Sequence, residues 1–236
     1  MNKALKLAHI LAARPYLSAL AFHRVAAAVE HVSVLKNLDC RTVVDVGANR
    51  GQFALVARRC FPQALILSIE PLAVPAARFR QILGKDSRVL LSQAAVGNVS
   101  GKTTIHVSRE DDSSSLLPIT ARQTALFPGT AEARTQTVRI GRLSEFVDAQ
   151  SIEPPALLKL DVQGYELEAL RGCAGLIDRF RYVYVECSFV ELYQGQALAT
   201  EVIGWLGEQG FQLRGVHNTS YDRQDQAIQG DFLFVR

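Results

Sequence analysis

The sequence has few cysteines, and none of them lie close together. The four are Cys40, Cys60, Cys173 and Cys187, with no C-x-x-C pair among them. Such spacing is typical neither of a zinc site nor of a disulfide framework. Reduced thiols are the simplest interpretation, and they favour a protein of the cytoplasm.

The chain also lacks an excess of charge of either sign. Its 26 basic and 23 acidic residues give a formal net charge of +3 over 236 residues. No basic arm or stripe of the kind that binds nucleic acid is present, so we expect no nucleic-acid partner. The hydrophobic share of 48% and the charged share of 21% are ordinary for a globular protein that buries a core.

A long uninterrupted hydrophobic run is missing as well. The apolar stretches near the start are broken by His9, by Arg14-Pro15 and by His23. None is long enough to cross a bilayer. We expect residues 1–40 to form a helical extension, with two amphipathic helices separated at Pro15. Peripheral attachment of these helices to a membrane surface is the alternative interpretation.

From residue 41 onward, short apolar runs alternate with helical patterns. We expect strands at 42–46, 64–70, 88–96, 156–160, 182–187, 211–216 and 231–235, and helices at 51–60, 73–83, 143–147, 164–171 and 198–208. This alternation is typical of a parallel sheet with crossover helices. The last two strands are joined by a loop alone, so they can pair antiparallel. Residues 41–236 are therefore predicted to form one α/β, Rossmann-like domain with a mostly parallel seven-stranded sheet.

An insertion interrupts the alternation in the middle of the chain. Two extra strands are expected at 103–107 and 136–140, with a polar segment at 109–133 between them. Long loops inside compact domains are usually functional or disordered. We expect this segment to be a lid over an acceptor, in which Ser114 and Ser115 hydrogen-bond a ligand; a mobile polar loop is the alternative. Three arginines in or next to this segment are candidates for binding an anionic group such as a phosphate: Arg109, Arg122 and Arg134.

The most informative motif is the turn that joins the first strand to the first helix. A dinucleotide-binding turn has the pattern G-x-G-x-x-G. The corresponding positions here are Gly47, Asn49 and Gln52, so two of the three glycines are absent. The pattern acidic-x-G-x-G-x-G fits better, with Asp45 as the acid, Asn49 in place of one glycine, and Gly51 as the last.

This turn suits S-adenosylmethionine, a cofactor that carries a sulfonium, an ammonium and a carboxylate but no phosphate. We expect Asp45 to face the ammonium, directly or through water, although Asp45 capping the next helix is the alternative. Gly47 and Gly51 allow close approach and positive φ. Free N–H groups of the turn, with Asn49 and Phe53 beside them, are expected to complete the site of the amino-acid end.

A second acidic strand end follows at Glu70. A carboxylate at that position can accept hydrogen bonds from both ribose hydroxyls, and a solvated strand end before Pro71 is the alternative interpretation. Small residues around Ala95, at the end of the third strand, leave room for a flat base. Asp45 and Glu70 together predict a nucleoside-type cofactor over the ends of the parallel strands.

Several segments carry a resemblance to a known family. They read DVGANRGQF at 45–53, SIEP at 68–71, QAAVGN at 93–98, SSSLL at 113–117, LLKLDVQGYELEALRG at 157–172 and DFLFVR at 231–236. These motifs resemble the FkbM family of S-adenosylmethionine-dependent methyltransferases, over about residues 41 to 236. The resemblance implies methyl transfer to oxygen, on a sugar of a glycan or glycolipid or on a polyketide hydroxyl. Many members have a glutamate where this chain has Gln163, which keeps hydrogen-bonding capacity without the charge.

Candidate catalytic residues lie at the ends of the later strands. Asp161 is the first candidate for a base that accepts the hydroxyl proton, with an N-cap role as the alternative. Glu186 lies among apolar residues, where burying an unpaired carboxylate is costly. We therefore expect it either to position the acceptor or to pair with a basic side chain. His217 is a rival base in a predicted turn. Asn218, next to it, and Gln163 are expected to contact the substrate.

Three alternatives remain open at this stage. Asp161 and Glu186, together with Asn218 or Asp231, are oxygen donors that would suit Mg²⁺ and so allow metal assistance, although no tight ligand spacing marks a metal site. A nicotinamide-dependent oxidoreductase would use the same fold. A binding module without catalysis on a methyltransferase scaffold is the third, since fold alone does not dictate function.

Overall fold

The computed structural model describes residues 6, 10, 11 and 13–236. Within them the N-terminal region forms helix α2 (Arg14–His23), a 3₁₀ turn η1 (Val29–His31) and a short helix α3 (Val32–Leu35). Pro15 lies in the first turn of α2, a position that tolerates the missing N–H. The helix predicted before Pro15 falls mostly outside the described residues. The one predicted after it ends early, because Arg24 adopts a left-handed conformation.

A seven-stranded sheet forms the centre of the molecule, with the strand order β3-β2-β1-β7-β8-β10-β9. Its strands are β1 (Thr42–Val46), β2 (Leu65–Ile69), β3 (Val89–Ser92), β7 (Ala156–Leu160), β8 (Tyr182–Ser188), β9 (Gln212–Tyr221) and β10 (Ala227–Val235). All neighbouring pairs are parallel except those of β10, which runs antiparallel to both β8 and β9. The predicted α/β fold is confirmed.

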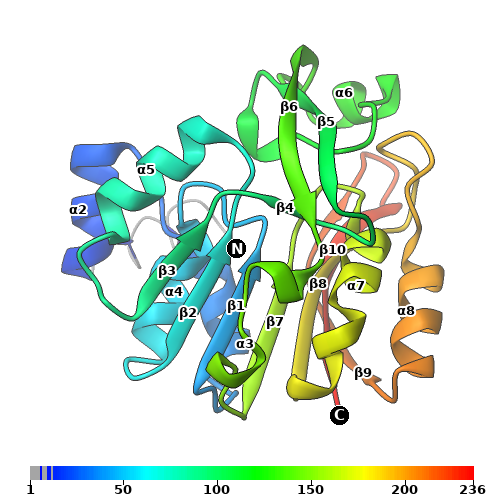
Figure 1. Cartoon of the computed structure of the whole chain (residues 1–236). Coiled ribbons are helices and arrows are strands. Elements are labelled where there is room, and N and C mark those ends of the chain that lie inside the picture. The colour runs from blue at the N-terminus through cyan, green and yellow to red at the C-terminus, as the bar shows by residue number, and fades with distance from the viewer. Residues whose placement is uncertain (1–5, 7–9, 12) are drawn as a thin grey trace.

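Helices cover both faces of this sheet (Figure 1). One face packs against α2 and α3 and against α4 (Gln52–Cys60) and α5 (Ala73–Leu83), and the other against α7 (Glu166–Cys173) and α8 (Ala199–Glu208). Alternate strand residues supply the two cores: Val43 and Leu157 face the first layer, Val44 and Leu158 the second. Strands buried on both faces explain the continuous apolar runs in the sequence. The N-terminal helices share the first core, and the boundary at residue 40 stays a prediction.

The insertion forms a second, three-stranded sheet above the strand ends (Figure 1). Its strands are β4 (Ala95–Val96), β5 (Gly101–Ser108) and β6 (Glu132–Gly141), in the order β4-β6-β5. The strand predicted at 88–96 is therefore wrong as a single element, because the chain bends at Ala94 and leaves the main sheet after β3. Segment 109–133 is more ordered than predicted, since it contains η2 (Asp111–Ser113) and helix α6 (Ala121–Leu126).

The C-terminal hairpin is longer than the sequence predicted. Strand β9 continues to Tyr221, so His217 and Asn218 lie inside a strand and not in a turn. Asn218 has a φ of 48° and lies at a register shift against β10, which marks a bulge. Three further 3₁₀ turns complete the fold: η3 (Leu143–Glu145) in place of a predicted helix, η4 (Ala149–Ser151) and η5 (Ala174–Arg179).

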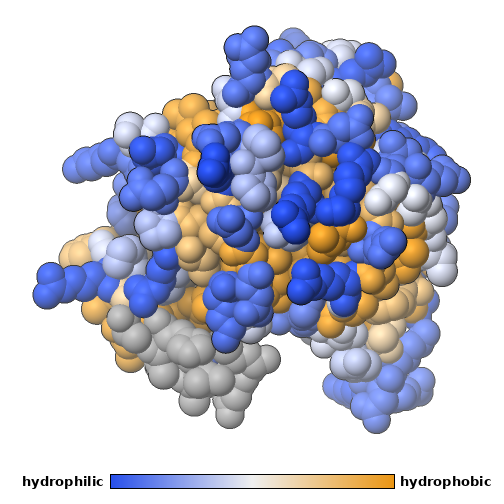
Figure 2. All heavy atoms as spheres, turned by 90° about the horizontal axis from the view of Figure 1, so that it is seen from below, coloured by the Kyte–Doolittle hydropathy of each residue, from blue (hydrophilic) through white to orange (hydrophobic). Residues whose placement is uncertain are grey.

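Seen from below, hydrophilic side chains are scattered among hydrophobic ones over this face of the molecule (Figure 2). Among the residues that the structure describes, no helix is both long and apolar enough to cross a bilayer.

Candidate active site

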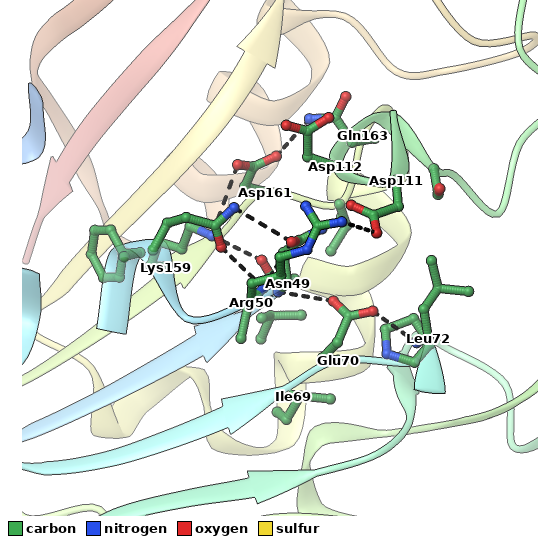
Figure 3. A pocket seen from close by; sticks show the side chains of 18 of the residues that line it. Asn49, Arg50, Ile69, Glu70, Leu72, Asp111, Asp112, Lys159, Asp161 and Gln163 are labelled. Atoms are coloured by element: carbon green, nitrogen blue, oxygen red, sulfur yellow. Dashed lines mark hydrogen bonds and ion pairs between the residues drawn. The ribbon is translucent and has the colours of Figure 1, made fainter. Parts of the chain in front are cut away.

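A cavity of about 390 Å³ opens at the carboxyl ends of β1, β2 and β7 (Figure 3). This volume is within the usual range of small-molecule sites, roughly 300–1,000 Å³. Strand ends and the turn after β1 form its floor. The N-terminal segment 24–31 and residues 111–116 of the insertion form its cover. The main lining residues are Arg24, His31, Gly47, Asn49, Arg50, Phe53, Glu70, Ala95, Asp111, Asp112, Ser114, Lys159, Asp161, Gln163 and Tyr165.

The turn after β1 approaches the end of β7 very closely. Gly47 has a φ of 80°, and a Cβ there would lie 1.9 Å from the backbone oxygen of Asp161. The N–H groups of Gly47, Ala48 and Asn49 are already bonded, the first two to the oxygen of Ile69 and the third to Glu70. The prediction that these N–H groups are free for a carboxylate is therefore wrong.

The first residues of α4 offer N–H groups for that role instead. Gln52 and Phe53 both line the cavity and begin the helix, where N–H groups have no partner within the helix. Gly51 precedes them with a φ of 89°, as the pattern of glycines predicted. These unpaired N–H groups at the start of α4 lie a few residues later in the chain than those that the sequence indicated.

Asp45 lies beneath the cavity and not on its wall. Its side chain is 0% exposed, and its Oδ1 is 3.1 Å from the Nζ of Lys159, the residue opposite it on β7. The same Nζ donates to the oxygen of Gly47 at 3.2 Å. Burial raises the pKa of Asp45, and the Lys159 ammonium partly offsets that rise. A protein cation therefore occupies the place beside Asp45 that was predicted for the ligand's ammonium.

Oδ2 of Asp45 has no hydrogen-bond partner in the described part of the chain. Contact of Asp45 with the cofactor, directly or through water, stays a prediction. Lys159 was missed by the sequence analysis. Its signal was present, because a lysine inside a fully buried strand requires a partner of opposite charge.

Glu70 lies on the cavity wall at the end of β2. Glu70 is 4% exposed. Its two carboxylate oxygens accept hydrogen bonds from the N–H groups of Asn49 and Leu72, at 2.9 and 2.7 Å. Burial raises the pKa of Glu70 to about 7. Each oxygen keeps a lone pair for a further donor, so the carboxylate retains the capacity to hold hydroxyl groups. Ala95 lies nearby on the wall, where its small side chain leaves space.

Asp161 follows β7 and reaches the cavity, where Gln163 joins it to Glu186. The Nε2 of Gln163 donates to Oδ1 of Asp161 at 2.7 Å and to Oε2 of Glu186 at 2.9 Å. The Tyr193 hydroxyl donates to Oε1 of Gln163 at 2.6 Å. Glu186 does not line the cavity, and burial next to Asp161 raises its pKa well above the ordinary range. Asp161 is thus the one of the two carboxylates that a ligand can reach.

The two predicted serines differ in their surroundings. Ser114 lines the cavity, and its Oγ accepts the N–H of Ser108. Ser115 is 1% exposed, donates to the backbone oxygen of Gln163 and accepts the N–H of Leu117. The hydroxyl of Ser115 is therefore occupied by the fold, so the prediction that it contacts a substrate is not supported.

His217 and Asn218 are not among the residues that line the cavity. Asn218 donates to Asp231 at 2.8 Å, within the hairpin. The histidine on the wall is His31, whose Nδ1 lies 3.1 Å from the Tyr184 hydroxyl and 3.5 Å from Oδ2 of Asp231. Burial lowers the pKa of His31. No local pattern marks His31, because its polar partners Tyr184 and Asp231 lie more than 150 positions later in the chain.

An ion pair joins the insertion to the floor of the cavity. Nη2 of Arg50, in the turn after β1, lies 2.5 Å from Oδ2 of Asp111. Asp112 extends over Asp161 from the same segment (Figure 3). The three arginines predicted to hold an anionic group do not line the cavity: Arg109, Arg122 and Arg134.

A metal centre was an alternative in the sequence. Among the described residues, no group of three or more His, Cys, Asp or Glu side chains is arranged to hold a metal ion. The amide of Gln163 lies between the two carboxylates that the metal hypothesis required to share an ion.

Comparison with known proteins agrees with this geometry. Residues 45–213 match the methyltransferase FkbM domain. The chain is 27% identical to the 2-O-methyltransferase NoeI of Sinorhizobium fredii over 190 residues, 76% of this chain and 74% of that protein. It is 26% identical to methyltransferase sdnD of Sordaria araneosa, over 72% of this chain and 73% of that one.

A solved structure with the same fold is that of Streptococcus pneumoniae Sp1610 in complex with S-adenosyl-L-methionine. The TM-score is 0.50 at 8% identity, with 87% of this chain and 72% of that chain covered. The domain match favours methyl transfer over the hydride transfer of a nicotinamide enzyme. The chain belongs to the FkbM family of S-adenosylmethionine-dependent methyltransferases.

Proposed function

We propose that this protein transfers a methyl group from S-adenosylmethionine to a hydroxyl of a sugar, in a glycan, a glycolipid or a related acceptor. The observation that carries the proposal is the Asp161 carboxylate on the wall of a cavity floored by a nucleoside-type turn. The name of NoeI, a 2-O-methyltransferase, supports transfer to oxygen. A cytoplasmic location, expected from the four free cysteines, belongs to the same proposal.

The residues of the floor fit the cofactor part by part. Glu70 would hold the ribose hydroxyls, and the wall at Ala95 would leave room for the adenine. The first N–H groups of α4, near Phe53, would bind the carboxylate. Gly47 allows the backbone approach that the turn needs. When bound, the cofactor would supply an electrophilic methyl group on a sulfonium, whose sulfur departs readily as a neutral thioether.

Asp161 then acts on the acceptor. Its Oδ1 is engaged by Gln163, and its Oδ2 is 3.9 Å from the Lys159 ammonium, so Oδ2 is the oxygen that accepts the hydroxyl proton. Alignment of reacting groups contributes up to about 7–11 kcal/mol in favourable cases, and a positioned base about 10²–10⁴-fold in rate. Orientation of the hydroxyl therefore outweighs its deprotonation, and residual activity should survive the loss of the base.

The wall around Asp161 favours an acceptor that is uncharged at the reacting position. Asp112 and Asp161 face this part of the cavity, and their oxygens accept hydrogen bonds from sugar hydroxyls. A phosphate or sulfate next to the reacting hydroxyl would meet these carboxylates. The arginines of the insertion lie away from the cavity, so they do not compensate for that repulsion.

The test has two stages. Calorimetry should give binding of S-adenosylmethionine and of its demethylated product, and a folded protein that binds neither would refute the proposal. Transfer of a labelled methyl group should then be measured on neutral methyl glycosides, oligosaccharides and glycolipids, with phosphorylated sugars beside them. Methylation of a neutral sugar supports the proposal; binding without transfer to any of them supports a module without catalysis.

A further inference from the structure

Gln163 has a strained backbone that its surroundings hold in place. Its φ is 55° in a turn that continues into Gly164 at 91°. Left-handed backbone is uncommon for residues other than glycine, and it persists only where neighbouring contacts fix it. Glu166 accepts the N–H groups of Val162 and Gly164, both at 3.1 Å, and Ser115 donates to the oxygen of Gln163 at 2.5 Å. Both ends of the turn are therefore fixed.

The hydrogen bonds around Gln163 favour one orientation of its side-chain amide. The NH₂ group donates to Oδ1 of Asp161 and to Oε2 of Glu186, and an ionised carboxylate at Asp161 can only accept. The Tyr193 hydroxyl donates to the amide oxygen. Exchange of the amide oxygen and nitrogen would set an oxygen against two carboxylates. The bonds to Asp161 and Tyr193 together thus favour the orientation with the NH₂ group toward the acids.

Among the described residues, Gln163 is the one whose side chain hydrogen-bonds both Asp161 and Glu186. Its amide is a neutral group between these two acids. Oε1 of Glu186 accepts a second amide, that of Gln229, at 2.8 Å. The other charged groups that influence Glu186 are the acids Glu166 and Asp231 and the base Lys159. Without an amide donor, the carboxylates of Asp161 and Glu186 would face each other in a buried place, where like charges are costly.

We propose that Gln163 is a positioning residue for Asp161. Its NH₂ group ties Oδ1 of Asp161 to Glu186, and this leaves Oδ2 as the oxygen that meets the acceptor. The proposal rests on the proposed function, since it assigns a role to the surroundings of the base.

The chemistry of an amide explains the choice of residue. A glutamate has the same shape, but it donates only when it carries a proton, and then through one hydrogen. A glutamate at position 163 would place three carboxylates together, and the geometry of Asp161 would depend on which of them holds a proton. An amide has two permanent donors, so the arrangement persists across the neutral pH range.

The decisive variant is Gln163→Glu, compared with Gln163→Ala, Tyr193→Phe and the surface control Glu168→Gln. The titration of Asp161 is followed by carboxyl ¹³C NMR in each variant, and kcat is measured against pH on the acceptor found above. In Gln163→Glu we expect the titration and the acid limb of kcat to move together to higher pH by about one unit or more. Gln163→Ala removes the donor without adding a charge, so the titration should shift less. Tyr193→Phe should give the smallest shift, because Tyr193 hydrogen-bonds Gln163 and not Asp161.

Binding of S-adenosylmethionine, measured by calorimetry, should change by no more than about threefold, because the floor is untouched. An unchanged titration and pH profile in Gln163→Glu would overturn the proposal. If that variant does not fold, Gln163→Ala and Tyr193→Phe decide in the same way: wild-type profiles in both would overturn it. If the wild-type protein binds no S-adenosylmethionine, the proposed function fails, whereas the NMR titration still reports on the bond between Gln163 and Asp161.

Discussion

The floor and the cover of the cavity are built in different ways. The floor consists of strand ends, and sheet register fixes Asp45 opposite Lys159 directly. The cover consists of segments 24–31 and 111–116, which come from before the first strand and from the insertion. Its contacts to the floor include a side-chain pair, Arg50 with Asp111, and a backbone hydrogen bond from Ala28 to the oxygen of Gln52. We infer that the floor is rigid and intolerant of change, while segment 111–116 of the cover adjusts.

The two parts also differ in how deeply their ion pairs are buried, and hence in the free energy lost when a pair is broken. The side chains of Asp45 and Lys159 are 0% and 7% exposed, whereas those of Arg50 and Asp111 are 35% and 16% exposed. Removing one partner of a buried pair typically costs about 3–5 kcal/mol, but an exposed pair contributes about 0–1 kcal/mol. Substitutions in the floor should therefore have much larger effects than substitutions in the cover.

The largest effect is expected from Gly47→Ala. The new Cβ would lie 1.9 Å from the backbone oxygen of Asp161, and φ is +80°. Positive φ alone costs about 1–3 kcal/mol for such a residue, and the floor must also move. Calorimetry should show weaker binding of S-adenosylmethionine by more than about 100-fold. Gly204→Ala is the matched control, since nothing lies within 4 Å of its new Cβ. Wild-type affinity in Gly47→Ala would contradict a rigid floor.

Asp161→Asn should reduce kcat by about 10²–10⁴-fold, because an amide does not accept the hydroxyl proton. Its oxygen can still accept the NH₂ of Gln163, so the affinity for S-adenosylmethionine should stay within a few-fold of wild type. Steady-state kinetics on the identified acceptor measure this effect. His217→Ala, on a strand outside the cavity, should leave kcat unchanged, and a larger loss there than in Asp161→Asn would reverse the assignment of the base.

Glu70 should make stability depend on pH. Burial raises its pKa from 4.5 to about 7 in the folded protein, so the folded state retains a proton that the unfolded state has lost. The stabilisation is complete below about pH 4.5 and is lost as the pH rises through 7, by at most about 3 kcal/mol. Urea unfolding between pH 5 and 8 should give a shallower decline for Glu70→Gln. Part of the decline should remain, since Glu166 also has a pKa of about 7.

The smallest effect is expected at the contact between floor and cover, from Arg50→Ala. Loss of the partly exposed pair with Asp111 should cost about 1 kcal/mol or less, or up to about fivefold in the dissociation rate of S-adenosylmethionine. Stopped-flow fluorescence measures that rate. Arg58→Ala is the matched control, because it breaks a similar pair with Asp86 outside the cavity. An effect of Arg50→Ala as large as that of Gly47→Ala would remove the distinction between floor and cover.

The same contrast separates what the sequence predicted from what it missed. Strand ends follow from local patterns, so the fold and the places of Gly47, Glu70 and Asp161 on the cavity wall could be predicted. His31 could not, because its place depends on packing against Phe53 and Tyr184, with ring centroids 5.4 and 5.5 Å away.

Errors within the predicted set arose for similar reasons. Ser115 is occupied by a carbonyl 48 residues away, and His217 lies in a strand whose length depends on pairing with β10. Asp45 was predicted as a site residue, but its partner Lys159 lies more than 100 residues later in the chain and was not predicted. Local motifs thus identify which residues lie at a strand end, while hydrogen bonds across the fold decide which of them remain free.

The wall formed by segment 24–31 lies outside residues 45–213, the region that matches the FkbM domain. An excised fragment of residues 45–213 would lack His31 and the whole of β10. Strand β8 would then become an open edge, prone to pairing with other chains. A fragment cut at residues 45 and 213 should therefore aggregate, and a functional fragment must retain both segment 24–31 and β10.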